Sequence, residues 1–168
     1  MKRFGAGILL ILFAAGCGGW GDYVYKSDRF KFKLTFPDKW EVMDRSDDKR
    51  DFLIAALPDI PDARIIVTAL PVAPDISPNE IYPSFMEGKG DAAILMEFKI
   101  TEKSTISAKN AEGRLIKVQW LGENTTMQGL RTIFLGNRFI LEISAEMPQE
   151  QFLNHEIDLK KMIRLLEL

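Results

Sequence analysis

The sequence has 168 residues, of which 46% are hydrophobic, a formal net charge of −2, one cysteine and one histidine. One cysteine excludes an internal disulfide framework, and one imidazole excludes metal sites built from several histidines. The slight acidity gives no electrostatic reason to expect nucleic acid as a partner. A chain of this length suits a single domain whose core needs no disulfide.

Residues 1–16 have the pattern of a secretory signal peptide. Lys2 and Arg3 precede the apolar run ILLILFAA. A bilayer core needs roughly 20 apolar residues as a helix, so this run is too short to span it. The small residues of the run AAG then lead directly into Cys17.

The sequence Ala-Ala-Gly-Cys resembles the lipobox of bacterial lipoproteins, with Ala14 at the position where leucine is usual. In that family the cysteine thiol receives a diacylglyceryl group, the peptide is cut before it, and the new N-terminus is acylated. We therefore expect Cys17 to be the lipid attachment site, because an unpaired thiol in an exported chain is a liability unless it is used. The alternative is an ordinary signal peptide followed by an incidental cysteine.

The predicted organisation is a signal peptide at 1–16, a lipidated tether at 17–22 and one domain at 23–168. Several acyl chains would give stable attachment to the exported side of a membrane in the cell envelope. Gly18 stands where aspartate retains lipoproteins at the inner membrane of enteric bacteria. In a source with two membranes, this predicts the periplasmic face of the outer one.

The domain begins with the alternating segment FKFKLTF at residues 30–36, which predicts a half-buried strand. Pro37 is expected to end this strand because it has no amide hydrogen to donate, and Trp40 is expected to return to the core. Residues 45–51 then form a charged, solvated turn.

This turn includes the spacing that begins a calcium loop, at Asp44, Ser46 and Asp48. The positions that should hold glycine and glutamate instead hold Lys49 and Ala55. We therefore interpret the segment as a loop without a bound cation.

The remaining elements follow from periodicity and from turn and cap residues. Ser77 as N-cap and Pro78 as the first residue predict the start of a middle helix. Gly136-Asn137 predicts a tight hairpin with positive φ. The expected elements are strands near 52–57 and 63–70, a meander of strands near 97–107, 114–121, 127–135 and 138–145, and an amphipathic helix from about residue 148.

Apolar residues occupy both faces of RLIKVQWL and LRTIFL, which indicates a sheet covered on both sides. This order of elements and the phrase FKLTFPDKW resemble the PsbP-like family over roughly residues 23–167. That family takes in the extrinsic photosystem II protein, the Ran-binding Mog proteins and many bacterial lipoproteins of unknown function. The resemblance implies an α+β fold, an α/β/α sandwich with a mainly antiparallel sheet covered by helices on both faces. It also implies a binding, assembly or chaperone module, and it places no functional residue.

His155 is the one imidazole and the one candidate general base. Its spacing from Phe152 and Leu159 puts it on the buried stripe of the last helix, which favours a packing role. Nucleophile-elbow, phosphate-loop and dinucleotide-binding patterns do not occur. The sequence therefore predicts no enzymatic activity, no cofactor and no metal.

We interpret the chain as a membrane-anchored envelope lipoprotein that acts as a non-catalytic binding or assembly module with an envelope protein as partner. Open apolar surface is expected near Leu115, Leu121, Ile133 or the loop 71–78. Two alternatives remain, a carrier of a small apolar ligand and an envelope hydrolase that pairs His155 with a nearby carboxylate. A pocket with convergent polar groups would favour the enzyme, and a dry tunnel would favour the carrier.

Overall fold

The computed structural model of this chain describes residues 23–73 and 77–168. The predicted signal peptide, Cys17 and the tether lie outside the described residues. The elements in chain order are β1 (Val24–Lys26), β2 (Lys33–Thr35), β3 (Glu41–Asp44), β4 (Asp51–Ala56), β5 (Arg64–Pro71), α1 (Pro78–Glu87), α2 (Lys89–Ala92), β6 (Met96–Ser107), β7 (Glu112–Leu121), β8 (Thr126–Gly136), β9 (Phe139–Pro148) and α3 (Gln149–Arg164).

Most strands form one antiparallel sheet in the order β3-β4-β5-β9-β8-β7-β6, and β1 and β2 form a separate antiparallel pair. The meander expected in the second half is β6 to β9, so that prediction is confirmed. β9 also pairs with β5, which joins the two halves of the chain into a single sheet. The sequence did not predict β3.

The helix α3 covers one face of this sheet. Its apolar residues Phe152, Leu159 and Ile163 are buried in the main core, which confirms the predicted stripe. Alternate residues of the strands face the same core, because successive side chains of a strand point to opposite sides. Those sheet residues include Leu53, Ala55, Ile65, Val67, Leu115, Leu130, Leu141 and Ile143.

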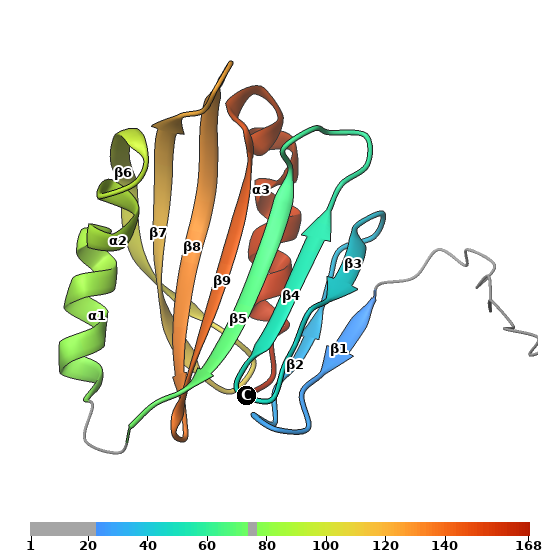
Figure 1. Ribbon diagram of the computed structural model, residues 1–168, viewed down its shortest axis with the longest axis vertical. Coiled ribbons are helices and arrows are strands. Elements are labelled where there is room, and N and C mark those ends of the chain that lie inside the picture. Colours follow the sequence, from blue (N-terminus) through green and yellow to red (C-terminus); the bar gives the residue numbers. More distant parts are fainter. Residues whose placement is uncertain (1–22, 74–76) are drawn as a thin grey trace, which may run out of the picture.

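The other face is covered only in part. Ile116, Val118 and Trp120, which alternate with Leu115 along β7, form a smaller cluster with residues of α1 such as Phe85. α1 and α2 contact β6, β7 and β8, and Figure 1 shows β9, β5 and β4 uncovered beside them. The fold is therefore a mainly antiparallel sheet with three helices in the described residues, and α1 and α2 cover only one end of their face.

The apolar residues of the FKFKLTF segment are all buried, as their alternation predicts. The regular strand is nevertheless limited to β2. Lys31 adopts a positive φ of 59°, and its amide donates to the Ser27 carbonyl oxygen at 3.0 Å. A turn therefore replaces the first part of the expected strand.

The predicted helix start is confirmed, since α1 begins at Pro78 with Ser77 as its N-cap. α1 ends at Gly88, which has φ 62° and would bring an added Cβ within 2.8 Å of the Phe98 ring. The hairpin between β8 and β9 is tight, but its positive φ of 68° occurs at Arg138. Among the described residues, no helix is both long and apolar enough to cross a membrane.

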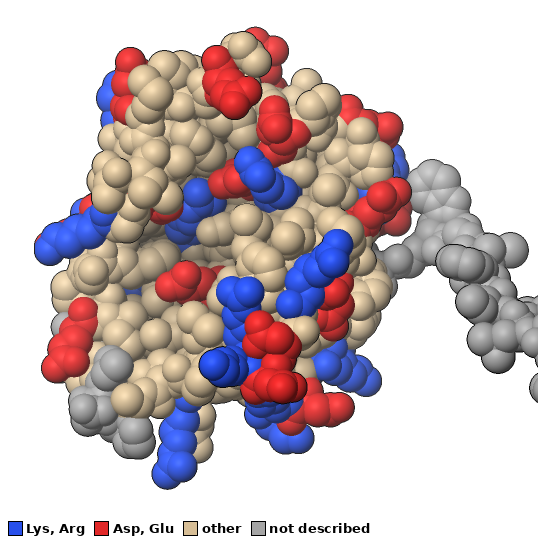
Figure 2. Space-filling model, in the orientation of Figure 1, with Lys and Arg blue, Asp and Glu red and all other residues tan. Residues whose placement is uncertain are grey.

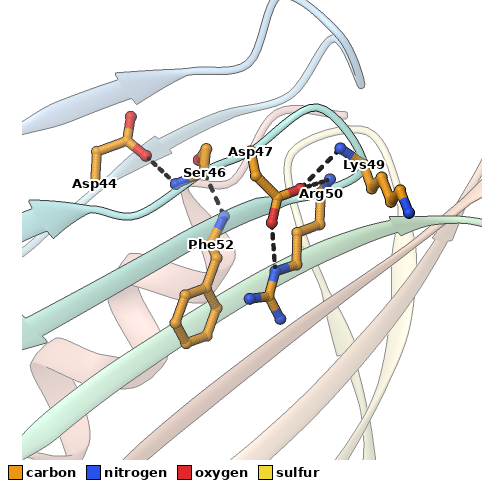
Figure 3. A network of polar contacts seen from close by, with 6 residues as sticks. All are labelled: Asp44, Ser46, Asp47, Lys49, Arg50 and Phe52. Carbon is orange, nitrogen blue, oxygen red and sulfur yellow. Dashed lines mark hydrogen bonds and ion pairs between the residues drawn. The ribbon is translucent and has the colours of Figure 1, made fainter.

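The charged turn between β3 and β4 satisfies its own polar groups (Figure 3). The Asp44 carboxylate accepts from the Ser46 amide at 2.9 Å, and the Asp47 carboxylate accepts from the amides of Lys49 and Arg50 at 2.8 and 3.1 Å. These hydrogen bonds hold the pKa of Asp47 below its usual range, the bond from Lys49 contributing most. The carboxylates of Asp44 and Asp47 thus accept from the backbone, as expected of a solvated turn.

Trp40 is only 8% exposed and packs in the main core, beside Leu159 and Met162 of α3. Trp40→Ala should lower the free energy of unfolding by about 3 kcal/mol, as truncation of a large buried aromatic residue does. Urea denaturation followed by circular dichroism measures this loss. Ile157→Ala is the control, because Ile157 is 78% exposed on α3 and should change stability little. A loss below about 1 kcal/mol for Trp40→Ala would contradict its place in the core.

Candidate functional site

Two open clefts stand out in the described part of the chain. One of about 470 Å³ lies beside α3, and one of about 490 Å³ lies between α1–α2 and the strands β8 and β9. Both volumes fall within the range of small-molecule sites. Their polar groups differ, and so does the chemistry that each can support.

The cleft beside α3 contains His155, which is half-buried at its rim and not on the buried stripe that the sequence predicts. Asp38, Asp59 and Asp158 line the same cleft. None of them makes a hydrogen bond or ion pair with His155 in the described structure. His155 and these carboxylates thus share one cleft without a direct contact among the described residues.

The second cleft is built around Arg131, which projects from the middle of β8 and is only 9% exposed. Its Nη2 donates to Glu146 Oε2 at 2.9 Å, and its Nε donates to Asp91 Oδ2 at 3.3 Å. Its guanidinium lies over the Trp120 ring, 5.3 Å from the centroid. Arg64 pairs with the other oxygen of Glu146 at 2.6 Å. A chain of ion pairs thus joins α2 to three strands.

Glu142 lines this cleft from β9 and makes no ion pair or hydrogen bond with any described residue. Its side chain keeps contact with solvent, but protein atoms on the walls of the cleft displace part of its hydration. This partial burial raises the pKa of Glu142, the charge of Asp91 raises it further, and Arg131 offsets part of the rise. Figure 2 shows this hollow, with acidic and basic side chains along it.

The charges around the second cleft do not balance. Arg131 and Arg64 face the three carboxylates of Asp91, Glu142 and Glu146, so one negative charge is left over. Lys89 also lines the cleft, but its ammonium pairs with Glu87 at 2.7 Å. Among the described residues, no three potential ligands gather as a metal site.

Beyond the cleft, apolar side chains continue over the uncovered strands, and we call this surface the open face. Its members share the side of the sheet that points away from α3. They are Met43, Phe52, Ile54, Ile66, Leu70 and Ile140, all partly or largely exposed. Figure 2 shows uncharged surface between groups of charged side chains on this face.

The open apolar surface does not lie where the sequence predicts it. Leu115 and Ile133 are each 1% exposed, because Leu115 packs under α3 and Ile133 forms part of the floor of the second cleft. Leu121 is exposed, as expected. In the loop 71–78, residues 74–76 lie outside the described residues.

The charge pattern of the β8 and β9 segments could have predicted the second cleft, although it was not used for that purpose above. In the segment LEISAE, Glu142, Ser144 and Glu146 recur at every second position, so they share one face of β9. Arg131 is the one charge in the apolar run of β8, and cross-strand pairing sets it opposite Ser144. Acidic residues on one strand opposite a lone base on the next predict an ion-pair network on that face.

Glu142→Gln should raise the free energy of unfolding at about pH 7, because the folded protein disfavours ionisation of this carboxyl. A raised folded-state pKa means that its favourable contribution is present at low pH and is lost as the pH rises through that pKa. The gain should therefore shrink as the pH falls toward about 4. Urea titrations at both pH values measure it.

Glu123→Gln is the matched control for this experiment, since Glu123 is an exposed carboxylate in the turn between β7 and β8. It should leave stability almost unchanged at both pH values. A variant Glu142→Gln that is less stable than the wild type at neutral pH would show that the carboxylate forms a stabilising contact in the folded protein.

No family model and no curated protein matches this chain. Solved structures do resemble it. Cyanobacterial PsbP (CyanoP) from Synechocystis sp. PCC 6803 superposes with a TM-score of 0.69 at 10% identity, covering 91% of this chain and 95% of that one. LpqN of Mycobacterium tuberculosis, involved in cell envelope biogenesis, gives 0.61 at 12% identity over 89% and 91%. The Saccharomyces cerevisiae Ran-binding protein Mog1p gives 0.56 at 10% identity over 89% and 96%.

At identities this low, the likeness concerns the fold. The resemblance noted in the sequence therefore holds at that level, and the described domain has the PsbP-like fold.

Proposed function

We propose that this chain is a lipid-anchored, non-catalytic binding or assembly module of a bacterial cell envelope, and that an envelope protein docks on its open face. Cys17 carries the anchor in this proposal. In a source with two membranes, the protein is attached to the periplasmic face of the outer one. In this proposal α1 and α2 cover only one end of their face of the sheet, and the docked partner covers the remaining strands of that face.

The observation that carries this proposal is the open face itself. Ile54 and Ile66 are cross-strand neighbours on β4 and β5, and no helix of the described chain covers them. A contiguous apolar surface of this kind on a soluble domain marks an interaction site. Charge at its edges would orient a partner, since the Arg50 guanidinium lies 4.8 Å from the centroid of the Phe52 ring.

The placement in the envelope is supported by two independent features. The N-terminal sequence leads from a short apolar run through small residues to the only cysteine. LpqN, which shares the fold, is involved in cell envelope biogenesis.

A second neighbour supports the binding role. Mog1p, which also shares the fold, is a Ran-binding protein. The fold therefore supports protein binding in at least one neighbour.

Two observations weigh against the alternatives. A hydrolase would need His155 paired with a carboxylate, and His155 has no hydrogen-bond partner among the described residues. A carrier of an apolar ligand would need a dry enclosed cavity. Large side chains such as Phe32, Phe134 and Phe152 fill the core, and charged residues line both clefts.

Replacing Cys17 by serine should release the protein from the membrane fraction, because serine cannot form the thioether to diacylglycerol. Fractionation of cells followed by immunoblotting measures this release, and a shift in mobility on gels reports the lost acyl chains. Sedimentation of the Cys17→Ser variant with membranes would show that another anchor exists.

A photo-crosslinking residue at Ile66 should capture a discrete partner in intact membranes, whereas the same residue at Ile157 on α3 should not. Ile157 is the matched control because it is an equally apolar position on the far side of the sheet. The Ile66 adduct should disappear when Ile54→Asp is added. Equal adducts from both positions would contradict docking on the open face, and hydrolysis of an envelope substrate that is lost in His155→Ala would contradict the non-catalytic proposal.

A further inference from the structure

The cleft between α1–α2 and the strands β8 and β9 contains a carboxylate that the folded chain leaves without a partner. Glu142 lines it from the sheet side, and Asp91 approaches from α2 on the opposite side. Asp91 uses one oxygen to accept from Arg131. Burial raises the pKa of Glu142 most, and the like charge of Asp91 raises it further, so the two carboxylates lie close enough to interact.

The cation nearest to these carboxylates cannot neutralise Glu142. Arg131 is nine-tenths buried and already bonded to Asp91 and Glu146. Its remaining nitrogen, Nη1, is buried without a partner, and the guanidinium lies over the Trp120 ring. That nitrogen is therefore closed to an anion in the cleft. The other cation of the lining, Lys89, pairs with Glu87. The carboxylates of Glu142 and Asp91 supply the charged acceptors that line the cleft.

Apolar side chains line part of the cleft, beside its charged and polar groups. Ile116 and Ile133 form its floor, and Ile81 and Phe85 of α1 form the opposite wall. A volume near 490 Å³ is far larger than a bare metal ion needs and suits a small organic molecule. Ser144, two positions from Glu142 on the same face of β9, adds a further polar group to the lining.

We propose that this cleft binds a small organic cation, an alkylammonium compound whose charged nitrogen lies between Glu142 and Asp91 and whose carbon chain lies against Ile133 and Phe85. The leftover negative charge supplies the complementarity, and a charge-assisted hydrogen bond in a partly desolvated cleft is about twice as strong as a neutral one. A cation beside Glu142 would favour the ionised form of this carboxyl. This site is independent of the docking proposed for the open face.

The test uses hexylammonium chloride as the probe, with hexanol and sodium hexanoate as the matched neutral and anionic compounds. Two-dimensional amide spectra of the isotope-labelled protein should show saturable shifts around β8, β9 and α1 with hexylammonium, at a dissociation constant on the order of 1 mM. Glu142→Gln should weaken this binding about tenfold, since it removes one charge-assisted hydrogen bond. Glu123→Gln should bind like the wild type.

Three outcomes with the small probes would overturn the proposal. They are equal shifts with hexanol or hexanoate, unchanged affinity in Glu142→Gln, and the absence of saturation at roughly 10 mM probe. A lysine-containing tripeptide that binds more than tenfold tighter than hexylammonium would also overturn it, because the cleft would then take a side chain of a protein. Crosslinking at Ile66 is a separate measurement. If the cleft fails to bind the probe, docking on the open face still stands. If crosslinking fails, the proposed cation site still stands.

Discussion

The helices of the described chain cover the two faces of the large sheet unequally, and most other features of the structure follow from this constraint. α3 packs over the core face, whereas α1 and α2 reach only β6, β7 and β8. Apolar area left in water costs roughly 25 cal/mol per Å². The uncovered strands lower that cost by mixing polar residues such as Thr68, Ser144 and Arg64 among their isoleucines. The isoleucines that remain are the positions where a partner would gain most from burial.

The ion pairs of Arg131 lie where the part of the sheet covered by α2 ends and the open strands begin. A buried guanidinium must be compensated, and here Glu146 and Asp91 supply the compensation at 2.9 and 3.3 Å. Such a network adds little net stability compared with apolar packing, but the loss of one member leaves a buried charge unpaired. We infer that its main effect is to fix where α2 lies on the sheet. The position of α2 in turn fixes the distance across which Asp91 and Glu142 face each other.

The parts of the fold that depend on local patterns could be predicted from the sequence. The meander follows from the length and spacing of its apolar runs, and the start of α1 follows from Ser77-Pro78. The parts of the fold that depend on contacts between distant residues could not be predicted in this way. Nothing in the alternation of FKFKLTF indicates the positive φ of Lys31 that shortens β2. A strand that is apolar on both faces does not reveal which face a short helix leaves open, so Ile133 was expected to be exposed and is buried. One of the two partners of Arg131, Asp91, lies forty residues away, and only the folded chain brings the two together.

The point where the described domain begins relates the proposed anchor to the open face. The Tyr23 ring packs against Phe36 with centroids 5.9 Å apart, so the chain is held to the domain from its first described residue. The six residues from Cys17 to Tyr23 reach at most about 20 Å. Figure 1 places β1 at the edge of the molecule opposite α1, with the uncovered strands between them. A lipid on Cys17 would therefore keep β1 and β2 close to the bilayer and hold the open face within reach of membrane-bound partners, which raises their effective concentration. Full cellular function from a soluble, unlipidated form would separate the two halves of the proposed function, because docking on the open face would survive while the tether would contribute nothing.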